Sequence, residues 1–253
     1  MIDSRLTEFY ETNRILKPKH TEFPNFQTEF NKYQWLQNES GVPYWEIPLD
    51  GLPYKEMLNE AQELKSLFVD HRANDPSQMG ASHSGWASLT IHGISSQHTM
   101  NWDSYDEYRA LGDEKLVPYD WTEISDRIPK TVEYFKDIFP HESYTRVRFM
   151  LLKAGGYVLP HRDRDHKLLF PINIALNNPE GCNFIMENQG IVPFKEGKGF
   201  LLDLCNRHAV WNDSKEDRIH LIVHWKNAQY HEPSGKKWAE MVTRNYKATP
   251  KFI

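Results

Sequence analysis

The second half of this chain is a series of short apolar segments, each ended by Gly, Pro or Asn, and this pattern constrains the fold most. In residues 146–153, apolar side chains alternate with Arg146, Arg148 and their neighbours, which is the period-two pattern of a strand with two different faces. Ala154-Gly155-Gly156 predicts a turn. Further strands are expected at residues 157–161, 168–176, 183–187, 199–204, 208–211 and 218–225. Strands this short, separated by such turns, predict a mainly β (α+β) fold built as a double-sheet jelly roll.

The first half of the chain predicts helices instead. Apolar residues recur at helical spacing in residues 55–70 and 128–139, and more weakly in residues 3–13 and 25–37. Residues 86–92 predict a strand. Loops are expected at residues 72–85 and 93–120.

The last predicted strand, at residues 218–225, indicates how the two halves combine. Alternate positions from Ile219 to Trp225 are apolar, so this face should be covered, and the N-terminal helices are the available cover. The other face carries Arg218, His220, Ile222 and His224 and should look into the barrel. We therefore expect one structural unit. It would comprise a helix-rich part at residues 1–142 that supports the barrel and contributes substrate loops, a β core at 143–227 and a C-terminal tail at 228–253.

Composition excludes several classes of protein. The formal net charge is −5 and the isoelectric point is about 6.2, which argues against a nucleic-acid partner. No apolar run is long enough for a membrane span, and the N-terminus lacks the apolar core of a signal peptide. The two cysteines are too few for a disulfide framework. A cytoplasmic protein with a small-molecule substrate is expected.

His161-Arg162-Asp163 is the strongest candidate for a chemical site. Residues two apart on a strand point to the same side, so an imidazole and a carboxylate could bind one ion together. His208, at the head of a later strand, would complete the 2-His-1-carboxylate ligand set of non-haem Fe(II) oxygenases. Such a set leaves positions on the iron for 2-oxoglutarate and O2. Asp165 is an alternative to Asp163, and His166 is expected to be exposed.

Arg218 would complete a 2-oxoglutarate site, because a guanidinium matches a carboxylate with two parallel hydrogen bonds. His220, on the same face, is a candidate to hydrogen-bond 2-oxoglutarate, with an ordinary interior histidine as the alternative. Asn173 is expected to lie outside the pocket. The candidates for substrate binding are Arg146, Arg148, Trp86 and Trp102, with surface ion pairs or core packing as their alternatives.

Four segments resemble the aspartyl/asparaginyl β-hydroxylase-like family: RFMLLKAGGYVLPHRD, KLLFPINIALNNPEGCNF, GKGFLLDLCNRHAVWNDS and DRIHLIVHW. The resemblance covers roughly residues 143–227. It implies a double-stranded β-helix, which is a cupin-like jelly roll. It also implies iron ligands at His161, Asp163 and His208 and a 2-oxoglutarate anchor at Arg218. The cofactor would be Fe(II), with 2-oxoglutarate and O2 as co-substrates.

The resemblance also narrows the substrate. Family members that hydroxylate Asp and Asn residues in proteins lack the carboxylate ligand and carry an Arg-x-His pair on the following strand. Here Asp163 is present, and Phe170 and Ile172 stand in place of that pair. Both features favour the amino-acid and proline hydroxylase branch. The expected reaction hydroxylates an unactivated C–H bond of a free amino acid or small peptide, with succinate and CO2 as co-products.

Three alternatives stay open. The first is hydroxylation of an Asp, Asn or other side chain in a protein. The second is a cupin-like metalloenzyme that does not use 2-oxoglutarate, and the third is a non-catalytic binding module on the same fold. Motifs of zinc proteases, serine hydrolases, P-loop NTPases and thiol-redox proteins are absent from the sequence.

Overall fold

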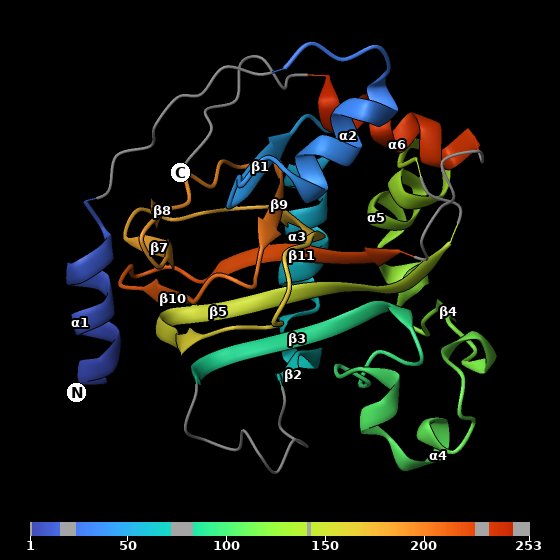
Figure 1. The fold of residues 1–253 in the computed structure, drawn as a ribbon. Coiled ribbons are helices and arrows are strands. Elements are labelled where there is room, and N and C mark those ends of the chain that lie inside the picture. The colour runs from blue at the N-terminus through green and yellow to red at the C-terminus, as the bar shows by residue number, and fades with distance from the viewer. Residues whose placement is uncertain (1, 16–23, 72–82, 141–142, 226–232, 245–253) are drawn as a thin grey trace.

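A curled antiparallel sheet dominates the computed structural model, which describes residues 2–15, 24–71, 83–140, 143–225 and 233–244 (Figure 1). Its eleven strands include one continuous hydrogen-bonded path, in the order β1-β9-β6-β11-β5-β10-β7-β8. These strands are β1 (Tyr44–Ile47), β9 (Gly199–Asp203), β6 (Leu169–Ala175), β11 (Arg218–Trp225), β5 (Tyr144–His161), β10 (His208–Asn212), β7 (Cys182–Met186) and β8 (Gly190–Ile191). Off this path, β3 (His83–Gly93) pairs with β5 and also with β2 (Val69–Asp70) and β4 (Asp120–Trp121). The predicted mainly β, jelly-roll architecture is confirmed.

Strand β5 runs through the segment where a turn was predicted, so that prediction was wrong. Its first half pairs with β11, from Tyr144 to Leu152, and its last residues pair with β10, up to His161. Gly155 has φ 71°, and a Cβ on Gly156 would lie 2.8 Å from two backbone carbonyl oxygens. The two glycines thus bend the strand from one part of the sheet into the other instead of reversing it.

The apolar face of β11 lies in the main core, as expected. Ile219, Leu221 and Val223 are at most 2% exposed. They belong to one cluster with apolar residues of α2 (Glu29–Asn38), α3 (Tyr54–Glu63) and the helical segment of α5 (Pro129–Glu133). Helix α1 (Ser4–Asn13) differs, because Leu6 and Phe9 pack beside Leu159, Ile185 and Ala209 of β5, β7 and β10. The N-terminal helices therefore do not all cover the same part of the sheet.

One predicted helix is shorter than expected, and another changes from an α-helix to a π-helical turn. The helix expected at residues 55–70 ends at Glu63, and a 3-10 turn, Lys65–Leu67, leads into β2. In residues 128–139, α5 continues into a π-helical turn, Tyr134–Ile138. The segment 93–120, expected as loop, contains three short helical turns, Trp102–Ser104, Asp106–Arg109 and Glu114–Leu116. Of the other expected loop, residues 72–82 lie outside the described residues.

The C-terminal part expected as a tail contains a helix, α6 (Pro233–Thr243). Trp238 is 3% exposed and its ring centroid lies 4.5 Å from that of Trp225. The indole N–H of Trp45 on β1 donates to the Val242 carbonyl at 2.7 Å. This helix therefore packs into the main core beside α2 (Figure 1). Within the part of the chain that the structure describes, no helix is both long and apolar enough to cross a membrane.

Candidate active site

His161, Asp163 and His208 converge at one end of the curled sheet. One potential ligand atom from each lies within 4.8 Å of the others. The Nε2 atom of His161 is 3.1 Å from Oδ1 of Asp163, and Nε2 of His208 is 4.0 Å from the same oxygen. The structure thus brings together the three residues predicted as ligands. Asp165 and His166 are exposed and do not belong to the group.

Backbone contacts set the tautomers of both histidines. Nδ1 of His161 lies 2.8 Å from the Leu159 carbonyl oxygen, and Nδ1 of His208 lies 3.0 Å from the Asn206 carbonyl oxygen. A carbonyl oxygen only accepts, so each Nδ1 must carry the proton and donate it. In the neutral rings, Nε2 of each histidine is then the acceptor atom, and it lies on the side of Asp163. A metal-binding histidine is usually oriented by such a contact on its other nitrogen. The donor set and its geometry therefore fit a divalent iron ion.

Arg218 is buried at 2% exposure on the inner face of β11. Its Nε donates to Asn178 Oδ1 at 3.2 Å, and its Nη1 donates to Nδ1 of His220 at 3.1 Å. Its Cζ lies 4.8 Å from the centroid of the Phe194 ring. Nη2 is buried without a hydrogen-bond partner in the described part of the chain. A carboxylate of a ligand would satisfy that donor, so the residues fit 2-oxoglutarate here.

His220 is neutral in this setting. Burial, then the charges of Arg218 and Arg148, hold its pKa well below the ordinary histidine value. Because Nδ1 accepts from Arg218, the single proton of the neutral ring sits on Nε2. His220 therefore accepts from the arginine and keeps one N–H for another partner.

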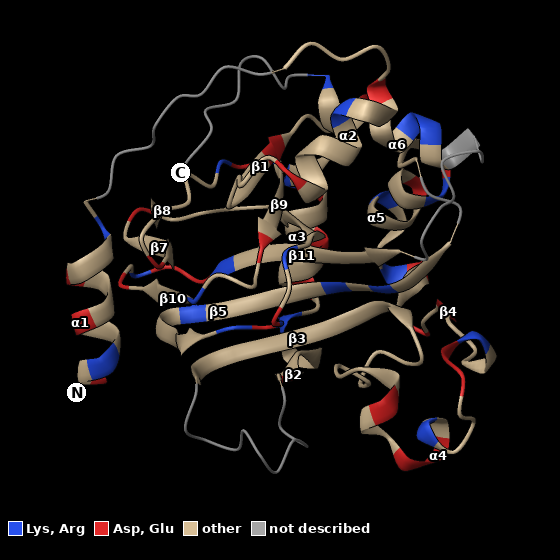
Figure 2. Ribbon diagram, viewed as in Figure 1, with Lys and Arg blue, Asp and Glu red and all other residues tan. Residues whose placement is uncertain are grey.

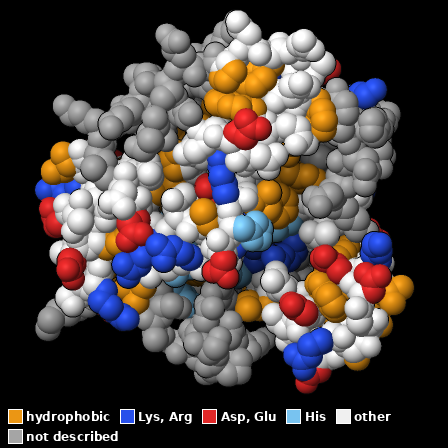
Figure 3. All heavy atoms as spheres, viewed as in Figure 1, with side chains coloured by type: hydrophobic (Ala, Val, Ile, Leu, Met, Phe, Trp, Pro, Cys, Tyr) orange, Lys and Arg blue, Asp and Glu red, His pale blue; other side chains and the backbone are white. Residues whose placement is uncertain are grey.

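The cavity beside these groups has a volume of about 240 Å³. Trp86, Arg146 and Arg148 line it, together with the three candidate ligands, Arg218 and His220. Trp102 does not line this cavity, but it lines an adjoining one of about 700 Å³ that shares Asn101, Arg146 and His224 with it. Figure 3 shows histidine and basic side chains in a hollow on this face of the molecule.

Asn173 also lines the cavity, which corrects the prediction that it lies outside. It is the cross-strand partner of Ile222, a residue of the inner face of β11, and directly opposite residues share a face. Ile172 and Phe170 instead contribute to the main core. Further lining residues could not be selected from the sequence, because they lie on loops or at a strand end without a periodic pattern; these are Arg164, Thr99, Met100 and His71.

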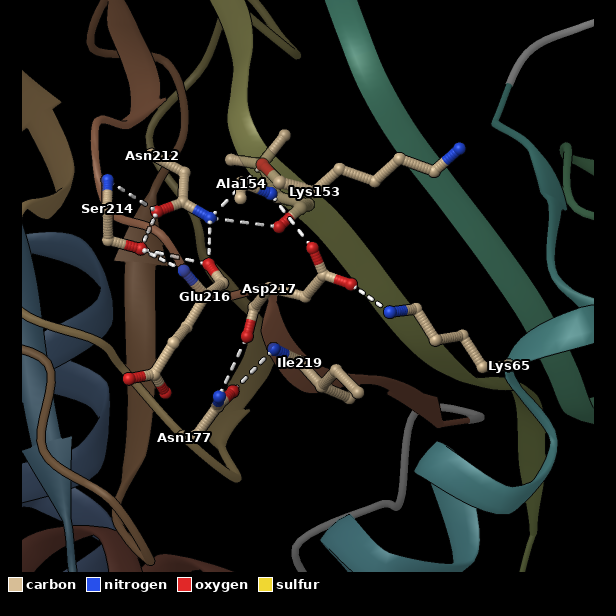
Figure 4. A network of polar contacts seen from close by, with 10 residues as sticks. Lys65, Lys153, Ala154, Asn177, Asn212, Ser214, Glu216, Asp217 and Ile219 are labelled. Carbon is tan, nitrogen blue, oxygen red and sulfur yellow. Dashed lines mark hydrogen bonds and ion pairs between the residues drawn. The ribbon is translucent and has the colours of Figure 1, made fainter.

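A polar network holds the β10–β11 turn that precedes Arg218 (Figure 4). The side-chain amide of Asn212, which is fully buried, donates to the carbonyl oxygens of Leu152, Lys153 and Glu216 at 3.0, 3.1 and 2.8 Å. Asp217 accepts from the Ala154 N–H at 2.8 Å and forms an ion pair with Lys65. The network ties the turn to the bend of β5 and to the segment after α3, and so fixes where β11 begins.

The residues of this site lie in a part of the chain that matches a known protein family. The family model described as aspartyl/asparaginyl β-hydroxylase matches residues 53–228. This range includes every residue predicted for iron, 2-oxoglutarate or substrate binding. A search of curated proteins found no significant sequence match.

Solved structures of related shape share little sequence with the chain. A prolyl-4-hydroxylase from Pseudomonas putida is 13% identical with a TM-score of 0.46, over 79% of this chain and 99% of that one. A 2OG-Fe(II) oxygenase family oxidoreductase from Burkholderia pseudomallei is 14% identical with a TM-score of 0.39, over 83% and 96%. The α-ketoglutarate-dependent epimerase SnoN from nogalamycin biosynthesis is 14% identical with a TM-score of 0.42, over 84% and 88%. At such scores, the functional assignment depends on the family match and on the site itself.

Proposed function

Since the chain belongs to the aspartyl/asparaginyl β-hydroxylase family and is a 2-oxoglutarate-dependent dioxygenase, we propose that it hydroxylates a C–H bond of a free amino acid or small peptide. Iron would be held by His161, Asp163 and His208, and 2-oxoglutarate by Arg218. When bound, Fe(II) and 2-oxoglutarate supply the oxidising chemistry, in which O2 provides the hydroxyl oxygen and succinate and CO2 are released. The family assignment disfavours a metalloenzyme that works without 2-oxoglutarate.

One observation carries the proposed site: a complete ligand set and an unsatisfied guanidinium line the same cavity. The ligand atoms lie within 4.8 Å of one another, and Nδ1 of each histidine donates to a backbone carbonyl oxygen, which leaves Nε2 as the acceptor nitrogen of the neutral ring. Nη2 of Arg218 is a buried donor that no group of the described residues accepts from. A ligand in the cavity would supply the missing acceptor. A non-catalytic relative would have no need to keep both features.

The chain's own residues would bind and orient the reactants. Arg218 would pair with the distal carboxylate of 2-oxoglutarate, because it stays charged and presents two N–H groups in one plane. His220 would accept from Arg218 through Nδ1, which holds the guanidinium plane, and its Nε2–H can donate to a ligand oxygen. The Phe184 ring stacks on the His208 ring, with centroids 5.2 Å apart and an interplanar angle of 7°. It would keep water from that side of His208.

The size of the cavity supports a small substrate. About 240 Å³ is room for 2-oxoglutarate and a compact partner, and Trp86, Arg146 and Arg148 are among the residues that line the cavity. The adjoining cavity of about 700 Å³ would receive the remainder of a peptide. The presence of Asp163, where the protein-hydroxylating relatives lack a carboxylate, favours the amino-acid branch.

Anaerobic titration with Fe(II) and then 2-oxoglutarate tests the site. We expect a weak visible metal-to-ligand charge-transfer band that His161→Ala and His208→Ala both abolish. A panel of the proteinogenic amino acids and their short peptides, scored for substrate-dependent succinate, then tests the substrate class. An unchanged band in both variants would remove the ligand assignment. Succinate release that only a folded protein substrate stimulates would move the assignment to protein side chains.

A further inference from the structure

The cavity carries more positive charge than its proposed cofactors can neutralise. Four arginines line it, Arg146, Arg148, Arg164 and Arg218, but Asp163 is the single carboxylate among the described lining residues. One Fe(II), one 2-oxoglutarate dianion, Asp163 and Arg218 together have no net charge. Of the other arginines, Arg148 donates to the Thr99 carbonyl oxygen. Arg146 and Arg164 face no carboxylate in the described part of the cavity wall besides Asp163. Burying uncompensated charge is costly, so a further anion is expected there.

Two of these arginines, with a histidine, lie together at the far end of β11. His224 and Arg146 are directly opposite each other on β11 and β5. The Phe170 ring packs edge-on against His224, with centroids 5.2 Å apart, and Cζ of Arg164 lies 5.9 Å from the Phe170 centroid. His224 therefore comes from β11, Arg146 from the neighbouring strand β5 and Arg164 from the loop after β5. All three side chains line the cavity.

Their polar atoms are poorly satisfied by the protein. Nε of Arg164 and Nδ1 of His224 are buried without a hydrogen-bond partner among the described residues. In the same part of the chain, neither Arg146 nor Arg164 makes an ion pair within 4.0 Å. Buried polar groups in proteins are nearly always bonded, so this cluster indicates a ligand that the protein does not itself supply.

We propose that Arg146, Arg164 and His224 form an anion-binding subsite that holds a carboxylate of the substrate. This inference rests on the proposed function, and it narrows the substrate to one that places an anionic group at this end of the cavity. Arg146 and Arg164 supply the charge and several N–H groups, and the neutral ring of His224 can donate one more.

The subsite cannot belong to the same 2-oxoglutarate molecule as Arg218. His224 is six residues from Arg218 on one strand, so their Cα atoms are about 20 Å apart. The five-carbon chain of 2-oxoglutarate cannot bridge that distance. Asp103 and Glu114, whose charges act on Arg146, line only the adjoining cavity. They leave the inner side of Arg146 open to an anion, and an ammonium group of the substrate could face them.

The test follows the arginine Nε–H signals by NMR in the Zn(II)-substituted protein saturated with 2-oxoglutarate, where no turnover occurs. Acetate is the probe and acetamide is its uncharged match. We expect the Arg164 signal to shift saturably with acetate and not with acetamide at the same ionic strength. Arg162 provides a control in the same sample, because its side chain is exposed and pairs with Glu187 at 3.1 Å. Its signal should not follow acetate.

Two variants sharpen the result. Arg146→Gln should weaken acetate binding at least tenfold, and Arg146→Lys should restore part of it, while 2-oxoglutarate affinity changes less than twofold in both. Equal shifts with acetate and acetamide, or no saturable shift, would overturn the subsite. A large loss of 2-oxoglutarate affinity in the Arg146 variants would also overturn it, since the arginine would then serve the co-substrate. If 2-oxoglutarate fails to bind the wild-type protein, the proposed function fails instead, and the acetate titration still decides the subsite in the metal-free protein.

Discussion

His161 and His208 are directly opposite each other on the antiparallel strands β5 and β10. Their ring centroids are 4.4 Å apart, and both Nδ1 atoms donate to backbone carbonyl oxygens two residues earlier in the chain. Strand pairing therefore sets the spacing of the two imidazoles, and the backbone determines which nitrogen carries the proton in the neutral ring. A pair arranged in this way is ready to bind a metal without side-chain rearrangement.

We predict that His161→Ala and His208→Ala each weaken Fe(II) binding by more than about 100-fold, since loss of a residue that only orients a ligand already costs 10–100-fold. Anaerobic titration measures the affinity. His166→Ala is the matched control, because His166 is exposed on the loop that follows β5 and lies outside the ligand group. Equal affinities in His161→Ala and His166→Ala would contradict the assignment.

Asp163 and Asp165 can be separated by the same titration. Asp163 Oδ1 lies 3.1 Å from Nε2 of His161, whereas Asp165 is exposed outside the group. Asp163→Ala should therefore lose Fe(II) affinity by about 100-fold or more, and Asp165→Ala should stay within about twofold of the wild type. The reverse order would make Asp165 the ligand.

Strand alternation predicted several of the site residues, and Asp163 followed from its spacing to His161, but most lining residues on loops could not be predicted from the sequence. Arg146, Arg148, Arg218 and His220 line the cavity because strand alternation places them on the inner face, as predicted. Trp86 also lines the cavity, whereas Trp102 lies in the adjoining cavity. Arg164 is on a loop, where no period connects neighbouring side chains.

The prediction that Asn173 lies outside the pocket was wrong for a different reason. Alternation within β6 shows which residues share a face, but not which face is inside. The Arg-x-His comparison led to Phe170 and Ile172 as the inner positions, whereas pairing with Ile222 of β11 puts Asn173 inside. Pairing with β9 is also irregular between Leu169 and Ile172. Only the neighbouring strand determines the orientation, and a single sequence does not contain that register.

Arg218 should dominate 2-oxoglutarate affinity. Replacing it by Gln removes the charge and the unsatisfied buried N–H, and losing one partner of a buried, hydrogen-bonded charge pair costs about 2–5 kcal/mol. The expected rise in the dissociation constant for 2-oxoglutarate is roughly 30-fold or more. Isothermal titration of the Zn(II) form measures it. Arg244→Gln is a suitable control, since Arg244 pairs with Asp50 at an exposed position. A change below threefold in Arg218→Gln would rule out the anchor role.

Asn212 should position Arg218 through the β10–β11 turn. Asn212→Ala leaves three carbonyl oxygens without their donor and should lower the free energy of unfolding by about 2–4 kcal/mol, measured by urea denaturation. Asn212→Asp keeps the shape but cannot donate, so it should destabilise too. In the folded variants the Michaelis constant for 2-oxoglutarate should rise more than that for the amino-acid substrate. Equal changes in both constants would mean that Asn212 is only structural.

The buried histidines on β11 should make the protein less stable in mild acid. Burial and then nearby arginines hold the pKa of His220, and likewise that of His224, well below the ordinary value of 6.5. Below pH 6.5 the unfolded chain therefore binds protons that the folded protein does not, so stability falls as the pH falls through this region. Each histidine contributes about 1.4 kcal/mol per pH unit until its folded-state pKa is reached.

His220→Gln should remove one of these two contributions while Gln Oε1 can still accept from Arg218. Urea unfolding of the metal-free proteins at pH 7.5 and pH 5.5 gives the comparison. Between these pH values the variant should lose about 1.4 kcal/mol less stability than the wild type. The wild-type loss arises because burial, and then the charge of Arg218, whose Nη1 is 3.1 Å from Nδ1 of His220, disfavour the protonated ring. An identical pH dependence in the two proteins would mean that folding does not lower the pKa of His220.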